Sequence, residues 1–152
     1  MYQVRTAGYS KRDQVKRWAL PDRVFFACGA CHILAYAFLE RRGDDWDVEW
    51  IRPATGFVGN HIFVSRGGRV FDYHGYSDRG RFLDHEWRTA RRLWPGWDAT
   101  LKRLPREALV SEAKSRMIDG LWLREPAQFL CDPLPRARRF LDRFHTSPEE
   151  MR

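Results

Sequence analysis

Three residue types that cooperate in nucleophilic catalysis occur in this sequence in a suggestive order: a cysteine, a histidine and an aspartate. Cys31 follows a short turn at Gly29 and precedes a strongly apolar run, so its thiol is predicted to lie in the first turn of a helix. Unpaired backbone N–H groups and the positive end of the helix dipole favour a thiolate at that place. His61 and Asp72 follow on two consecutive predicted strands. A thiolate, a base and a carboxylate that orients the base could therefore meet in one cleft.

Hydrophobic periodicity and chain breakers predict the elements that must position these residues. Residues 31–42 predict a helix that Gly43 ends, and apolar side chains surround most of its axis, which favours a central position. Alternating apolar and charged residues predict a half-buried strand over residues 46–50. Residues 60–66 and 69–74 predict a hairpin across a double-glycine turn. The histidine and the aspartate would thus lie on adjacent antiparallel strands.

The flanking segments are predicted to be mainly helical. Ser10 is expected to cap a short helix, and residues 23–27 are expected to form a short buried segment before the cysteine turn. From Tyr76 the pattern indicates loops, followed by helices over residues 85–93 and 105–117.

A C-terminal amphipathic helix is predicted after Pro133. Its apolar stripe consists of Leu134, Ala137, Leu141 and Phe144. Its opposite side carries Arg136, Arg139 and Arg143. We expect the stripe to dock on the core and the arginine side to stay in solvent.

Length and composition favour one globular domain. With 152 residues, of which 43% are hydrophobic and 14% aromatic, the chain can bury one sizeable core. We therefore expect a single domain over residues 1–152, with a core at about residues 23–75 and a helical C-terminal part at about residues 84–144. The three cysteines argue against a disulfide framework and leave room for a free thiol.

The net charge indicates which partners the protein could bind, and the length of its apolar runs indicates whether it could cross a membrane. A net charge of +7 fits an acidic partner, whereas scattered arginines without a groove-reading motif make nucleic acid an unfavoured partner. Neither a signal peptide nor an apolar run long enough to cross a membrane is found. A cytoplasmic protein is therefore expected, with non-classical secretion and the oligomeric state left open.

The segment over residues 28–35, Cys-Gly-Ala-Cys-His-Ile-Leu-Ala, resembles the Cys-Gly-Ser-Cys-Trp-Ala-Phe signature around the nucleophile of papain-like cysteine proteases. The second cysteine of that signature attacks the substrate, and it matches Cys31. Residues 60–64 and 70–72 resemble the histidine and aspartate strands of compact members of this superfamily, which include transglutaminase-like domains, NlpC/P60-like hydrolases and deamidating toxins. The resemblance covers about residues 23–75. It implies an α+β fold in which a central helix packs on a small antiparallel sheet.

The residue order and the resemblance together predict a cysteine hydrolase or acyltransferase that acts on amide or isopeptide bonds. Cys31 would be the nucleophile, His61 the general base and acid, and Asp72 the orienting acid. Protease, deamidase and transglutaminase-like activities all stay open. This chemistry needs no cofactor and no metal, and the expected partner is a protein or peptide substrate whose acidic groups would suit the basic chain.

Some neighbours of the predicted triad depart from the family pattern or extend it. Phe25 stands six residues before the nucleophile, where papain-like proteases have a glutamine that donates to the oxyanion. The backbone N–H of Cys31 and the side chain of Asn60 are the donors we expect instead. Phe63 and Phe71 are expected to shield the histidine and aspartate from water.

Four other uses of these residues stay open. A non-catalytic module on the same fold could bind nucleic acid or an acidic protein through its arginines. A thioredoxin-like dithiol could form from Cys28 and Cys31, because an apolar segment, Cys-x-x-Cys and a helix follow one another there too. Residues 28–32 also match the Cys-x-x-Cys-His pattern of c-type haem attachment. With His61, His74 and the two cysteines, the chain could supply four zinc ligands.

Each cysteine has a plainer interpretation as well. Cys31 could be a small buried hydrophobic residue at the start of a core helix. Cys28 is expected to be structural or a redox partner, and Cys131 is expected to lie in the core. His74 shares a predicted strand face with Asp72, so it is expected to line the same cleft.

Overall fold

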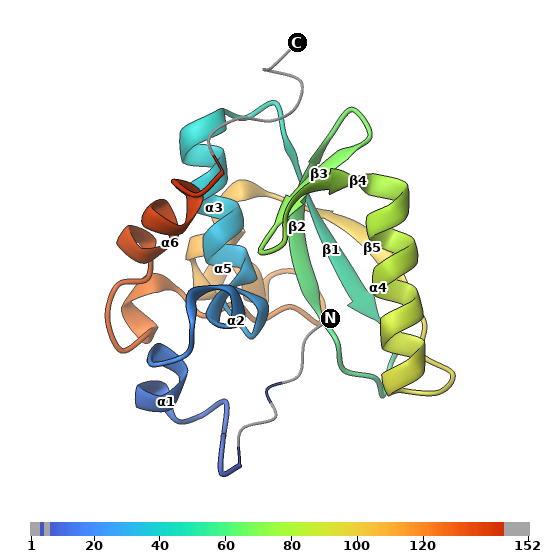
Figure 1. The fold of residues 1–152 in the computed structure, drawn as a ribbon, viewed down its shortest axis with the longest axis horizontal. Helices are drawn as coiled ribbons and strands as arrows, with labels where there is room; N and C mark the ends of the chain where they lie inside the picture. Colours follow the sequence, from blue (N-terminus) through green and yellow to red (C-terminus); the bar gives the residue numbers. More distant parts are fainter. Residues whose placement is uncertain (1–3, 5–6, 145–152) are drawn as a thin grey trace.

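A five-stranded antiparallel sheet forms the middle layer of the computed structural model, which describes residue 4 and residues 7–144 (Figure 1). The strands are β1 (Asp47–Pro53), β2 (His61–Arg66), β3 (Arg69–Asp72), β4 (Gly75–Asp78) and β5 (Ala99–Leu104). Their order across the sheet is β4-β3-β2-β1-β5, and each neighbouring pair is antiparallel.

Helices lie on both faces of this sheet. The six α-helices of the described residues are α1 (Gln14–Trp18), α2 (Asp22–Ala27), α3 (Cys31–Arg42), α4 (Arg79–Leu93), α5 (Glu112–Arg116) and α6 (Leu134–Leu141). There are also two short 3-10 helices: η1 (Arg106–Val110) lies between β5 and α5 in the chain, and η2 (Pro126–Gln128) lies between α5 and α6. In Figure 1, α4 lies on one side of the sheet, and α3 and α6 lie on the other. The fold is therefore α+β, as the sequence predicted.

Helix α3 is the centre of the larger apolar cluster, and its bounds match the prediction. The sheet covers one side of the helix and α6 and η1 cover another, so side chains around most of its axis are buried. Phe38 stacks on Phe71 of β3 with ring centroids 4.7 Å apart and meets Trp46 edge-on at 4.8 Å. Burial of one such aromatic side chain stabilises the fold by about 1.5–3 kcal/mol. Gly43 ends the helix at a φ of 93°.

A second apolar cluster lies between the sheet and α4. It consists of Ile51, Phe63, Val70, Phe82, Ala90 and Trp97. The helix is also tied to the sheet by charge, because Arg79 donates to both carboxylate oxygens of Glu49 on β1, at 2.9 and 2.6 Å. Glu49 is only 7% exposed, so this ion pair fixes the first turn of α4.

The predicted hairpin is present as β2 and β3. Gly67 and Gly68 both have positive φ values, 53° and 82°, which the tight turn between twisted strands requires. Strand β3 ends at Asp72, earlier than predicted. The chain then turns back at once into β4, where the sequence analysis expected a loop from Tyr76. That expectation was wrong because this edge strand is short and polar and lacks an alternating apolar pattern.

Three further expectations were wrong. Residues 99–104 form β5, an edge strand whose middle is exposed and therefore lacks apolar alternation, so the predicted helical C-terminal part is interrupted. Helix α4 begins six residues before the predicted start at residue 85, because Asp78 caps it and accepts from the Arg81 N–H at 2.9 Å. The predicted helix over residues 105–117 is divided into η1 and α5 at Ser111, which caps α5.

The N-terminal segments also differ from the prediction. The cap of α1 is Asp13, whose side chain accepts from the Lys16 N–H at 3.0 Å, whereas the Ser10 hydroxyl accepts from the Arg12 N–H, outside the helix. Residues 23–27 belong to helix α2, which begins immediately after Pro21. The cysteine turn therefore joins two helices.

The C-terminal helix α6 docks through Ala137 and Leu141, as its apolar stripe predicted, and also through Phe140, which the predicted stripe did not include. Its arginine side is not uniformly solvated. Arg136 donates to the carboxylate of Asp22 at 2.8 Å, to the backbone carbonyl of Trp18 at the end of α1 at 2.7 Å, and to that of Leu20 at 2.6 Å. It thereby clamps the N-terminal helices to α6. Cys131, expected in the core, is exposed.

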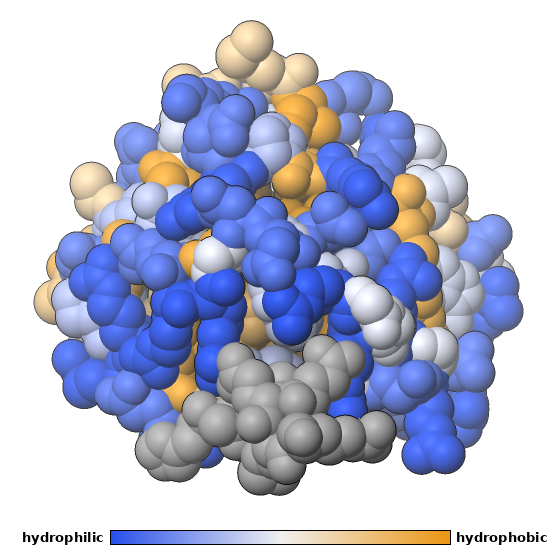
Figure 2. All heavy atoms as spheres, turned by 90° about the horizontal axis from the view of Figure 1, so that it is seen from above, coloured by the Kyte–Doolittle hydropathy of each residue, from blue (hydrophilic) through white to orange (hydrophobic). Residues whose placement is uncertain are grey.

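The outer surface is mainly hydrophilic on the face shown in Figure 2, where hydrophobic residues form small patches between charged ones. Among residue 4 and residues 7–144, no helix combines the length and the apolar character needed to cross a bilayer.

Candidate active site

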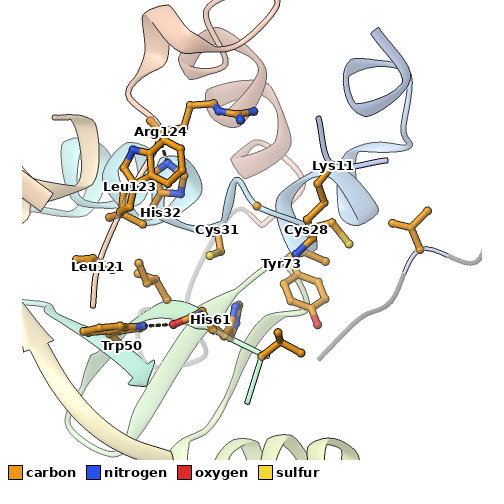
Figure 3. Close-up of a pocket in the computed structure, with 18 of the residues that line it drawn as sticks. Lys11, Cys28, Cys31, His32, Trp50, His61, Tyr73, Leu121, Leu123 and Arg124 are labelled. Atoms are coloured by element: carbon orange, nitrogen blue, oxygen red, sulfur yellow. Dashed lines mark hydrogen bonds between the residues drawn. The ribbon is translucent and has the colours of Figure 1, made fainter. Parts of the chain in front are cut away.

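A pocket of about 740 Å³ opens beside the first turn of α3 (Figure 3). Its walls come mainly from four parts of the chain that are distant in sequence. These are the cysteine turn with the start of α3, the loop that leads into β2, the segment over residues 120–124, and N-terminal residues that include Lys11 and Arg17. Both Cys31 and His61 line it, whereas Asp72 lies behind the histidine and outside the pocket wall.

Cys31 is the first residue of α3, and its backbone position is set by the turn that precedes it. Gly29 has a φ of 98°, which lets the chain reverse between α2 and α3. No side chain caps α3, so the N–H groups of its first turn remain available to a ligand. Figure 3 shows the half-buried sulfur directed into the pocket, toward His61.

The surroundings of Cys31 favour the thiolate. Burial of the sulfur by itself would raise the pKa of Cys31. Side-chain hydrogen bonds from His32 and His61, together with the charges of both imidazoles, outweigh burial and lower the pKa to about 5. The sulfur is therefore an anion near neutral pH.

His61 is the first residue of β2, and its ring is packed on several sides. It lies against Phe63, Tyr73 and Phe82, with ring centroids 5.5–6.2 Å apart, and is 3% exposed. Its Nε2 donates to Oδ2 of Asp72 at 2.9 Å, which leaves Nδ1 as the nitrogen for Cys31. Burial alone would lower the pKa of His61, but hydrogen bonds to Asp72 and Cys31 raise it to about 10.

Asp72 ends β3 and is 3% exposed. Besides His61, it accepts the backbone N–H of His74 at 2.8 Å and contacts His74 Nδ1 at 3.2 Å. Burial would raise the pKa of Asp72, yet these hydrogen bonds hold it well below its ordinary range. The structure thus brings Cys31, His61 and Asp72 into one connected group, in the order the sequence predicted.

Two neighbours of this group lie elsewhere than expected. His74 does not line the pocket but supports Asp72 from behind, with 42% of its side chain exposed. Phe71 points to the opposite face of the sheet and stacks on Phe38, so Tyr73 and Phe82 shield His61 together with Phe63.

The residue that sequence reasoning missed is His32. It lies on the first turn of α3, is 3% exposed and lines the pocket beside Cys31. Its Nε2 donates to the backbone carbonyl of Arg124 at 2.8 Å, across 92 positions of sequence. In the sequence it stood out only as the last residue of a haem-type pattern, because no local signal indicates that residue 124 lies opposite.

The donors for an oxyanion can be located in part. Asn60 lines the pocket, and its Oδ1 accepts from the indole N–H of Trp50 at 2.8 Å. Because its oxygen is engaged, the NH₂ group of Asn60 is the part able to donate to a ligand. The N–H of Cys31 is the second candidate donor. Phe25 is 1% exposed and packs inside the core, so it takes no part.

The metal and haem alternatives find little support in this geometry. Among the described residues, the group that could hold a metal ion is Asp72, His74 and Glu86, which does not include either cysteine. The four zinc ligands considered from the sequence are therefore not gathered. The haem pattern requires the ring of His32, whose Nε2 is bonded to the Arg124 carbonyl.

The thioredoxin-like alternative requires a strand before the Cys-x-x-Cys motif. The segment before Cys28 is helix α2, and each pairing in the sheet is antiparallel. Burial raises the pKa of Cys28, so this thiol is a poorer nucleophile than Cys31.

A scan against protein-family models found no match for this chain, and searches of the curated proteins and of the solved structures found none either.

Proposed function

We propose that this protein is a papain-like cysteine hydrolase or acyltransferase that acts on amide or isopeptide bonds. The observation that carries the proposal is the contact network from Cys31 through His61 to Asp72 beside an open pocket. The arrangement of a nucleophile at the start of a central helix, with histidine and aspartate on antiparallel strands, agrees with the resemblance in the sequence.

The first half of the reaction forms a thioester. The Cys31 thiolate attacks the carbonyl carbon of the scissile amide, which makes a carbon–sulfur bond and places negative charge on the carbonyl oxygen. The N–H of Cys31 and the amide of Asn60 stabilise that charge. The protonated His61 gives its Nδ1 proton to the leaving nitrogen, the carbon–nitrogen bond breaks, and the amine departs.

The second half releases the acyl group. Water or a substrate amine attacks the thioester while the neutral His61 accepts its proton, and the thiolate leaves with the sulfur's electron pair. Asp72 holds the imidazole in one orientation through both halves, because Nε2 stays bonded to it. A protein or peptide is the proposed substrate, and the acceptor decides between hydrolysis, deamidation and acyl transfer.

Alkylation with iodoacetamide at pH 6.5, mapped by peptide mass spectrometry, tests the proposal. We expect Cys31 to react at least about tenfold faster than Cys28 and Cys131, because a thiolate is the reactive form. The His61→Ala variant should lose this preference. Cys131→Ser is the matched control, since it removes the exposed thiol and leaves the pocket unchanged.

Two outcomes would contradict the proposal. Equal reactivity of Cys31 and Cys131 would mean that no thiolate is stabilised. Salt-sensitive binding of an acidic protein or nucleic acid that survives Cys31→Ala, without preferential alkylation of Cys31, would favour the non-catalytic module instead.

A further inference from the structure

The ionisable groups around the pocket, apart from the cysteines, histidines and tyrosines, are all cationic. Lys11, Arg17 and Arg124 line it, whereas no aspartate or glutamate is among the described lining residues. Figure 3 places Arg124 with His32 on one side of Cys31 and Lys11 with Cys28 on the other. These cations therefore lie on the pocket walls on both sides of Cys31, and the charges of Lys11 and Arg17 act on the neighbouring Cys28 thiol.

Arg17 carries a buried charge that has no acidic partner among the described residues. It lies on α1, is 6% exposed, and donates from Nη2 to the backbone carbonyl of Gly29 at 3.2 Å. Its Nε is buried and has no hydrogen-bond partner within the described residues. Among the ion pairs of residues 4 and 7–144, none involves this guanidinium. A ligand oxygen could satisfy Nε.

Arg124 has a second guanidinium nitrogen of this kind. Its Nη1 is buried and unpartnered in the described part of the chain. Both guanidinium groups lie over the ring of Phe129, with their central carbons 5.6 and 5.9 Å from its centroid. Burial, and then the charge of Arg124, lower the pKa of Arg17. The two cations are thus close enough to repel one another.

Two partly buried like charges are unfavourable unless an anion compensates them. Planar guanidinium groups bind carboxylate and phosphate oxygens through paired N–H donors. We propose that Arg17 and Arg124, with Lys11 at the rim, form a subsite for a carboxylate or phosphate group of the substrate. Its role in selecting a substrate rests on the proposed function, whereas its ability to bind an anion does not depend on that function.

A pair of alkylating reagents tests the subsite. Iodoacetate and iodoacetamide share a leaving group, but only iodoacetate is anionic, so the ratio of their rates at Cys31 reports the local charge. We expect Arg124→Gln to lower that ratio about threefold to tenfold. Arg88→Gln removes an equal charge from an exposed site on α4, outside the pocket, and should leave the ratio unchanged.

The outcomes separate the two proposals. An unchanged ratio in Arg124→Gln would overturn the subsite even if Cys31 is highly reactive. Slow alkylation of Cys31 by both reagents would contradict its assignment as the nucleophile. The subsite proposal would then be tested by direct binding of anions. Arg124 is preferred to Arg17 for substitution because Arg17 also holds the cysteine turn through Gly29.

Direct binding uses the Cys31→Ala protein, which needs no reactive thiol. Inorganic phosphate and succinate are titrated separately at constant ionic strength, with fluorescence of the pocket tryptophans Trp50, Trp94 and Trp122 as the readout. We expect saturable binding of at least one anion, weakened about tenfold or more by Arg124→Gln and unaffected by Arg88→Gln. The anion that binds more tightly indicates whether the subsite accepts a carboxylate or a phosphate group. No saturable binding of either anion would overturn the subsite.

Discussion

Nε2 of His61 lies 2.9 Å from Oδ2 of Asp72, and both side chains are almost inaccessible to solvent, at 4% and 1% exposed. A buried carboxylate that accepts from a buried imidazole fixes both the rotation and the tautomer of the ring. Nδ1 is consequently the atom that faces Cys31. The ionisation of the sulfur therefore depends on a residue that lies outside the pocket wall.

The first prediction concerns the pH dependence of Cys31. An ordinary cysteine thiol has a pKa of about 8.5. Because the pKa of Cys31 is lowered to about 5 and that of His61 raised to about 10, the thiolate–imidazolium pair should persist between these values. We expect the alkylation rate to rise through about pH 5 and stay nearly flat to pH 9, as measured with iodoacetamide.

The sign of each shift sets the two limits of that window. Below about pH 5 the sulfur is protonated and alkylation declines. Above about pH 10 the imidazole loses its proton, so amide cleavage should decline there while alkylation continues. A single rise centred near pH 8.5 would contradict the ion pair.

The second prediction is that Asp72→Asn impairs both reactivity and stability. Loss of the charge lowers the pKa of His61 and raises that of Cys31, so the alkylation rate at pH 6 should fall about tenfold or more. The buried imidazole loses its charged acceptor, which should reduce the free energy of unfolding by about 2–4 kcal/mol. Urea denaturation at pH 7 measures the loss.

Asp119→Asn is the matched control for this variant, because its carboxylate pairs with Arg52 while 92% exposed. A surface pair of that kind contributes less than about 1 kcal/mol. Since the pKa of Asp72 is depressed, its stabilising effect is complete above the unfolded value and fades as the pH falls. A stability difference between wild type and Asp72→Asn that grows in acid would contradict this assignment.

The third prediction separates the two roles of His32. In His32→Gln the side-chain amide can still donate to the Arg124 carbonyl, but the imidazole beside Cys31 is lost. We expect nearly unchanged stability and a raised pKa of Cys31 in the alkylation profile. His32→Ala should raise that pKa as well and destabilise the protein by about 1–3 kcal/mol, because a buried carbonyl loses its donor. Identical pH profiles for wild type and His32→Gln would restrict His32 to a structural role.

The fourth prediction concerns the turn between β3 and β4. Gly75 has a φ of 99°, and an added Cβ would lie 2.8 Å from the ring of Phe144. Gly75→Ala should therefore lower the free energy of unfolding by about 2–4 kcal/mol, from backbone strain together with the clash. Thermal denaturation measures the effect.

Gly68→Ala is the control for strain alone. Its φ is 82°, but nothing lies within 4 Å of an added Cβ, so about 1–2 kcal/mol is expected. Equal losses for the two variants would mean that Phe144 does not pack against the turn as described.

The strongest local patterns in the sequence predicted the corresponding elements well. Helix α3 could be predicted because its apolar residues are continuous and Gly43 ends it. The β2–β3 hairpin could be predicted because two adjacent glycines, the residue type that readily adopts positive φ, join two short runs of apolar residues. The edge strands β4 and β5 could not, since β4 is only four residues long and the middle of β5 is exposed, so neither shows a period of two in hydrophobicity.

The sequence by itself determined the nucleophile candidate and its order with the histidine and aspartate, because those residues lie on elements defined by local periodicity. Only the tertiary structure decided the remainder of the pocket. His32 meets the Arg124 carbonyl across 92 positions, and Arg17 reaches the cysteine turn from a separate helix. Such contacts depend on how distant segments pack, and no local pattern in the chain encodes them.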